Sequence, residues 1–142
     1  MLFGRRKRRI ARLLVVEDEP LIAFDNEHFL TDSGFTIVAT VDRVADATAL
    51  IESGTAVDLV LVDVSLADGS GLDVARAAGA RDMPVLFVTG NCPVEAREIA
   101  AGCLAKPYAQ RDLLAAIQAI DATLAGETPK RLPSGLRLFD QG

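Results

Sequence analysis

The stretch DLVLVDVSLADG, residues 58–69, decides the fold class of this 142-residue chain. Its first part is a short, continuous run of leucine and valine, which predicts a fully buried strand over Asp58–Val62. A strand that is apolar on both faces is typical of a parallel sheet that helices cover on both sides. Asp63 follows this strand directly, and Asp68-Gly69 predicts a turn before the next helix.

Outward from this stretch, short strands and helices alternate along the chain. Apolar runs predict the strands, and apolar residues three and four positions apart predict the helices, with Asp42 as the N-cap of the second helix. The predicted strands are Arg12–Val16, Phe35–Thr40, Asp58–Val62, Pro84–Val88 and Leu104–Ala105, and the predicted helices are Leu21–Asp32, Val44–Glu52, Leu72–Ala78, Pro93–Ala100 and Arg111–Leu124. Five strands that alternate with five helices predict an α/β fold with a parallel sheet.

The distribution of charge separates a basic N-terminal arm from an acidic remainder. Residues 1–12 contain six basic and no acidic residues, which leaves nine basic and 20 acidic residues for the rest. We expect a basic N-terminal arm over residues 1–11, a single domain over residues 12–124 and a C-terminal tail over residues 125–142. We interpret the arm as a solvated terminus, although a basic run also suits nucleic acid or an anionic membrane surface.

Composition limits the classes of partner. The net charge of −5 comes from an acidic body, so we expect no nucleic acid as the main partner, because contacts with phosphates need a basic face. No apolar run reaches the roughly 18 residues of a membrane span. Two cysteines are too few for a disulfide framework, so we expect a cytoplasmic protein. The tail is too short for a DNA-binding output domain, and its Leu136, Leu138 and Phe139 suit docking on the body or on a partner.

Polar side chains follow four of the predicted strands at the point where each strand ends. Glu17 and Asp18 follow the first strand, Asp63 the third, Thr89 the fourth and Lys106 the fifth. The carboxyl ends of parallel strands meet at one end of a sheet, so we expect these side chains to lie together. Two like charges 4 Å apart repel by about 4 kcal/mol at an effective dielectric near 20. The cluster therefore predicts a Mg²⁺ site, where a carboxylate can act as a nucleophile toward phosphorus.

These motifs resemble the motifs of two-component response regulator receiver domains. The resemblance rests on LVVEDEP at residues 14–20, LVDVSLADG at residues 61–69, Thr89-Gly90 and Lys106-Pro107, and it covers about residues 12–124. It implies a flavodoxin-like (βα)5 fold, a doubly wound parallel sheet with strand order 2-1-3-4-5. It also implies a protein that is not an enzyme beyond its own phosphorylation and dephosphorylation.

The resemblance gives each strand-end residue a role. Asp63 would be the phosphoacceptor, Thr89 and Lys106 would bind the phosphoryl group, and Pro107 would follow a cis peptide bond. The implied Mg²⁺ ligands are Glu17, Asp18, Asp63 and the backbone carbonyl of Ser65. Each side chain also has a purely structural interpretation, as a loop cap, a first-turn acid, a turn hydroxyl or a surface lysine.

A narrower resemblance suggests the signalling system. Phe87-Val88-Thr89-Gly90 is similar to the Phe-Ala-Thr-Gly motif of mostly single-domain alphaproteobacterial receivers, which implies the general stress response. The implied partner is a histidine kinase of the HWE or HisKA2 type, or a histidine phosphotransfer protein, with an unknown protein downstream. This chain has Cys103 where receivers commonly have an aromatic switch residue, and Cys92 where the branch has tyrosine. We therefore expect output to depend on Thr89 and the loop after it.

Three classes of function stay open from the sequence. The first is a phosphorelay receiver that acts through phosphate-dependent binding. The second is a constitutive protein-binding module whose switch has decayed, which the two cysteines suit. The third is a flavodoxin-type cofactor binder or a small hydrolase, which the Glu17-Asp18-Glu19 loop and the absence of tryptophan disfavour.

Overall fold

The centre of the molecule is a six-stranded sheet, in a computed structural model that describes residues 9–139. The strands lie in the order β2 (Thr36–Val41), β1 (Arg12–Val16), β3 (Leu59–Val62), β6 (Val85–Thr89), β7 (Gly102–Ala105) and β8 (Leu136–Leu138). The first five are parallel, and β8 is antiparallel to β7. The five parallel strands have the predicted order 2-1-3-4-5, so the flavodoxin-like arrangement is confirmed.

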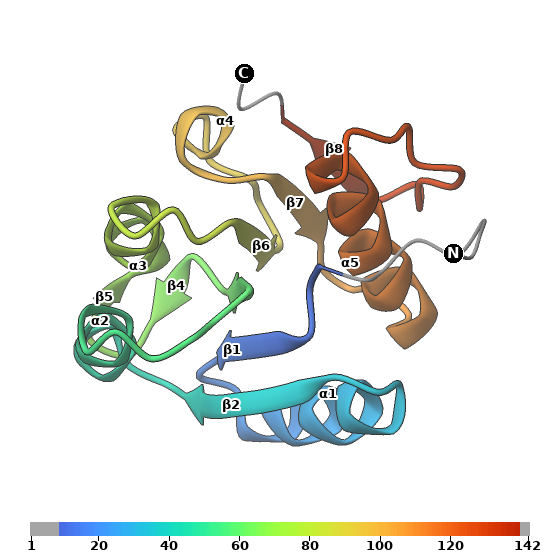
Figure 1. Ribbon diagram of the computed structural model, residues 1–142. Coiled ribbons are helices and arrows are strands. Elements are labelled where there is room, and N and C mark those ends of the chain that lie inside the picture. Colours follow the sequence, from blue (N-terminus) through green and yellow to red (C-terminus); the bar gives the residue numbers. More distant parts are fainter. Residues whose placement is uncertain (1–8, 140–142) are drawn as a thin grey trace.

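Five helices cover the two faces of the sheet (Figure 1). They are α1 (Pro20–Asp32), α2 (Val44–Glu52), α3 (Gly71–Gly79), α4 (Ala96–Ile99) and α5 (Gln110–Leu124). Side chains of β1 alternate between two core clusters. Leu13 and Val15 belong to the cluster that includes α1 and α5 residues, whereas Leu14 and Val16 belong to the cluster with α2, α3 and α4 residues. Both faces of a strand are thus buried, which explains the continuous apolar runs.

The prediction that Asp42 caps the second helix is wrong. The N-cap residue of α2 is Arg43, whose side chain makes no capping hydrogen bond. Asp68 accepts hydrogen bonds from the backbone N–H groups of Val44 at 2.6 Å and Ala45 at 3.1 Å. Asp68 lies in the turn between β4 (Ser65–Leu66) and β5 (Gly69–Ser70), 24 residues beyond Val44 in sequence. Only the tertiary fold brings this acceptor to the helix, so local sequence rules cannot find it.

The two ends of the described chain both pack on the body. The backbone N–H groups of Arg9 and Ile10 donate to the buried carboxylate of Asp121, at 3.1 and 3.0 Å. Part of the predicted tail forms β8, so its apolar residues dock on the body here. Most of the predicted basic arm, residues 1–8, lies outside the described residues. No helix of the described part is long and apolar enough to cross a membrane.

Candidate functional site

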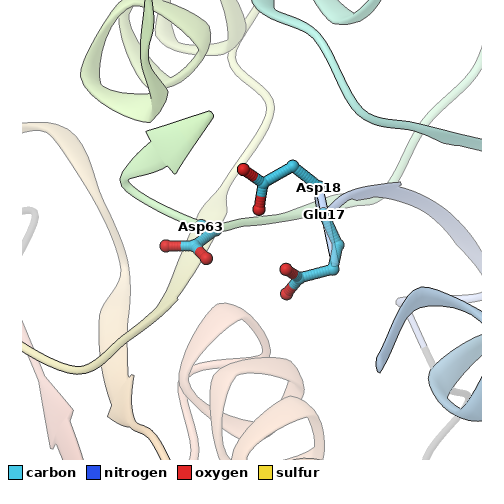
Figure 2. Close-up of side chains that lie close together, drawn as sticks. All are labelled: Glu17, Asp18 and Asp63. Carbon is cyan, nitrogen blue, oxygen red and sulfur yellow. The ribbon is translucent and has the colours of Figure 1, made fainter. Parts of the chain in front are cut away.

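Three carboxylates converge beyond the carboxyl ends of β1 and β3. Val16 and Val62 are partners in the parallel register, so the residues that follow them leave the sheet side by side. One oxygen from each of Glu17, Asp18 and Asp63 lies within 4.8 Å of the others. Figure 2 shows the three side chains pointing into a common space. Strand pairing alone therefore brings together acids that are far apart in sequence.

Lys106, which follows β7, supplies the counter-charge. Its ammonium Nζ lies 2.9 Å from Asp63 Oδ2 and 3.0 Å from Glu17 Oε1. The more exposed Glu19 carboxylate lies 3.7 Å away. Sequence alone predicts only a first-turn acid at Glu19, because nothing local shows that a lysine 87 positions later reaches it.

Burial makes the charges of this site interdependent. The Glu17 side chain is only 2% exposed and that of Lys106 only 18%. Burial raises the pKa of Glu17 above its usual value, and the hydrogen bond from Lys106 offsets only part of this effect. Burial also disfavours the charged form of Lys106, but the hydrogen bonds and charges of Asp63 and Glu17 outweigh it and raise the pKa of Lys106. Lys106 is therefore held as an ammonium.

The donor set fits a hard divalent cation. Three carboxylates and one ammonium leave a formal charge of −2 at the site. Carboxylate oxygens are the ligands that Mg²⁺ prefers, and Mg²⁺ needs only one or two of them, together with water and phosphate oxygens. Ser65 lies beside the cluster, where its backbone N–H donates to Asp63 Oδ1 at 3.2 Å.

Thr89 and Lys106 are joined through the backbone of neighbouring strands. Thr89 ends β6, pairs with Ala105 of β7 and is 7% exposed. The backbone N–H of Lys106 donates to the Thr89 carbonyl at 2.9 Å. The Thr89 hydroxyl has only long contacts of 3.4 Å, with the N–H and the carbonyl of Asn91. The peptide bond between Lys106 and Pro107 is cis.

Gly71 is a part of the site that sequence reasoning missed. A Cβ atom at this position would overlap the backbone carbonyl of Asp63, and the Gly71 N–H donates to the Val64 carbonyl at 2.7 Å. The first residue of α3 therefore presses directly against the backbone of Asp63. The run Asp68-Gly69-Ser70-Gly71 is typical of a turn, and no local signal distinguishes a glycine of close approach from a turn glycine.

A cavity of about 770 Å³ opens beside Lys106, between α1 and the start of α5. Its lining includes Glu19, Asn26, Pro107 and Tyr108. Asn26 Nδ2 donates to the Tyr108 hydroxyl at 2.8 Å, and burial is the main cause that raises the pKa of Tyr108. The cavity gives a second molecule an approach to Lys106 from the side of α1.

Several known proteins are similar to this chain in sequence or in fold. The chain is 34% identical over 79 residues to the phyllosphere-induced regulator PhyR of Methylorubrum extorquens, which covers 54% of this chain and 30% of PhyR. It spans 30% of the length of PhyR and between 43% and 54% of the length of three other curated regulators that it resembles.

Solved structures with the same fold include the following two. A response regulator receiver protein from Sinorhizobium medicae has a TM-score of 0.69 and 28% identity, covering 78% of this chain and 94% of that one. The receiver domain of a sensor histidine kinase from Pseudomonas aeruginosa, with a magnesium ion coordinated in its active site cleft, has a TM-score of 0.67 and 25% identity, covering 77% and 95%.

The family model for the response regulator receiver domain matches residues 13–118, from the first residues of β1 into α5. This range includes each of the strand-end residues described above. The chain belongs to the response regulator receiver domain family.

Proposed function

We propose that Asp63 accepts a phosphoryl group and that its phosphorylation alters the interactions of this chain with other proteins. Receiver domains act in two-component signalling, where Mg²⁺-dependent phosphorylation of an aspartate is general for the family. The observation that carries the proposal is the 2.9 Å contact between Lys106 Nζ and Asp63 Oδ2 inside a cluster of carboxylates. A carboxylate that is held against a fixed cation suits attack on phosphorus.

The transfer step is a displacement at phosphorus. An oxygen of Asp63 forms the new O–P bond while the N–P bond of a phosphohistidine donor breaks, and its electron pair stays on the donor nitrogen. The Ser65 N–H orients the Asp63 carboxylate from one side, and Lys106 balances charge from the other. The Thr89 hydroxyl, with only long contacts, is available to donate to a phosphoryl oxygen.

Mg²⁺ is the cofactor that we assign to the carboxylate cluster. Glu17, Asp18 and Asp63, with the backbone carbonyl of Ser65, are the proposed ligands. When bound, the ion neutralises charge that develops on the transferred phosphoryl oxygens. Support comes from the formal charge of −2 at the site and from the magnesium-bound receiver domain of Pseudomonas aeruginosa.

The upstream partner is a histidine kinase or a histidine phosphotransfer protein in the cytoplasm. The likeness to PhyR and the Phe87–Gly90 motif favour the general stress response and kinases of the HWE or HisKA2 type. Receiver domains are generally non-catalytic signalling modules, so we expect the chain to modify only itself.

Beryllofluoride, a mimic of the phosphoryl group, tests the proposal in solution. With Mg²⁺ present, we expect it to shift the amide NMR signals of Thr89 and Lys106 in the native chain. The shifts should disappear in Asp63→Asn and persist in Asp73→Asn, which changes an exposed carboxylate on α3. Unchanged spectra in the native chain, or equal shifts in Asp63→Asn, would contradict the proposal.

A further inference from the structure

β8 covers the edge of the parallel sheet with very few residues. It has three residues and pairs with β7 through Leu138 opposite Gly102, Arg137 opposite Cys103 and Leu136 opposite Leu104. Hydrogen bonds at its two ends join Gly135 O to Ala105 N at 3.0 Å and Phe139 N to Ala101 O at 2.9 Å. Figure 1 shows β8 at the end of the sheet farthest from β2. Without β8, β7 would have an open edge of unpaired backbone groups.

Gly102 has no side chain in the space that β8 occupies at this edge. A Cβ atom there would lie 2.9 Å from the Arg137 carbonyl oxygen, and its next neighbours would be Leu138 and Leu136. The three atoms nearest to this Cβ position all belong to residues of β8. The glycine therefore allows the backbone of β8 to approach closely, and a larger residue at this position would collide with it.

The side chains of β8 define what this edge accepts. Leu136 is buried in the core cluster that includes Leu113 and Ile117 of α5, and Leu138 packs against the same cluster. Phe139 packs against the cluster on the opposite face, whereas Arg137 is exposed. An extended segment with apolar residues at alternate positions therefore fits the edge, as in strand addition to other sheets.

The fit between β8 and the body is incomplete. Two cavities lie against its second half. One of about 450 Å³ is lined by Arg97 of α4 with Arg137, Leu138 and Phe139, and one of about 230 Å³ extends to Cys92. Residues 125–135, which join α5 to β8, contain no helix or strand. β8 is a three-residue strand at the edge of the sheet and pairs with one neighbour, β7, which is typical of segments that open locally.

From these observations we infer that the edge of β7 is a binding site for an extended segment of a partner protein, and that β8 occupies this site as a replaceable ligand from the same chain. The partner segment pairs antiparallel to β7 and places apolar side chains where Leu136 and Leu138 lie. The hydrogen bond from Ala105 N to Gly135 O is one residue from Lys106, so an occupant of the edge lies next to the lysine that contacts Asp63.

A peptide of residues 131–139 tests the site with the full-length chain. The double variant Leu136→Asp, Leu138→Asp removes the apolar contacts of β8 and frees the edge. We expect the peptide to bind this variant at least about tenfold more tightly than the native chain, where the tethered β8 competes at high effective concentration. Leu132→Asp, at an exposed leucine before the strand, is the matched control and should behave as the native chain does.

Adding Gly102→Val to the double variant should abolish peptide binding, because the new side chain occupies the space of the incoming backbone. Failure of the peptide to bind the freed chain, or binding that Gly102→Val leaves unchanged, would overturn the inference. Dimerisation of the native chain that Gly102→Val abolishes would assign the edge to a second copy instead, and would also contradict it. No phosphodonor or Mg²⁺ is present, so this result is independent of the chemistry at Asp63.

Hydrogen exchange of the native chain tests the same inference without any substitution. The amides of Ala105 and Phe139, which bond across the β7–β8 pair, should exchange by local opening, well before the amides of β3. Exchange of all these amides at the rate of global unfolding would show that β8 is a fixed strand and would overturn the inference.

Discussion

At the scale of the residue, Lys106 supplies the positive charge that offsets the repulsion between the carboxylates of the acidic cluster. Its ammonium contacts Asp63 and Glu17 within 3.0 Å, and the Glu17 side chain is almost fully buried. A buried charge that loses its partner is costly, because neither water nor another ion compensates it. The stability of the metal-free site therefore depends on Lys106 and the carboxylates being present together.

Lys106→Ala should destabilise the metal-free chain by about 1–3 kcal/mol, less than for a fully buried pair because Lys106 is partly exposed. Adding Glu17→Gln should recover part of the loss, because it removes the stranded charge. Urea unfolding of both variants measures this, with Lys130→Ala at an exposed lysine as the control. An effect of Lys106→Ala as small as that of the control would contradict the charge balance.

The strand-end residues of the site could be predicted because topology alone determines where they lie. Glu17, Asp18 and Asp63 follow neighbouring parallel strands, so their convergence needs no information about side-chain packing. Gly71 could not be predicted as part of the site, because its role depends on a backbone contact between the start of α3 and Asp63.

At the scale of the element, two helices depend on contacts from the segment after Asp63. α3 starts with Gly71 against the Asp63 backbone, and α2 receives the Asp68 carboxylate at its first N–H groups. The segment from Asp63 to Gly71 therefore fixes both helix starts together with the backbone of Asp63.

Gly71→Ala should move the start of α3 away from Asp63. We expect a loss of about 1–3 kcal/mol in unfolding free energy, typical of an overpacked position, and weaker binding of Mg²⁺ with beryllofluoride. Gly79→Ala at the other end of α3 is the matched control, because a Cβ there meets nothing within 4 Å. That control should be neutral or slightly stabilising. Equal effects of the two substitutions would contradict the proposed contact.

Asp68→Ala should lower stability at neutral pH but not in acid. The N–H groups of Val44 and Ala45 lower the pKa of Asp68 in the folded chain. Its contribution is therefore present above the ordinary aspartate pKa and disappears as the pH falls through the lowered folded value. Urea unfolding at a series of pH values measures the difference from the native chain. Asp32→Ala, at an exposed aspartate, should show no such window; a difference for Asp68→Ala that persists in acid would refute the cap.

Two elements near the edge of the sheet differ from the prediction. The fourth helix was expected over Pro93–Ala100 and is observed only over Ala96–Ile99. β8 was not predicted as a strand, since a three-residue segment becomes one only through the edge of β7, more than 30 residues earlier. Apolar runs predict buried strands well, whereas short edge strands depend on their partner.

At the scale of the whole molecule, the parallel sheet gathers charge at one end. A divalent ion there should stabilise the native state, because the unfolded chain has no such site. Lys106, which belongs to this cluster, directly follows β7, and β7 pairs with β8 at the edge of the sheet.

Mg²⁺ at about 100 times its Kd should raise the unfolding free energy of the native chain by about 2.7 kcal/mol. Asp18→Asn should lose most of this gain, since Asp18 belongs to the carboxylate cluster, whereas Asp73→Asn should keep it. Thermal or urea unfolding with and without Mg²⁺ measures the gain. An equal gain in Asp18→Asn and the native chain would place the ion elsewhere.

The most direct test of the central claim is intact-mass spectrometry after incubation with a small acyl phosphate. The account predicts a mass increase of one phosphoryl group that requires Mg²⁺, maps to Asp63 and is absent from a folded Asp63→Asn variant. A native chain that stays unmodified with Mg²⁺ present, or a phosphoryl group that maps to another residue, would contradict it.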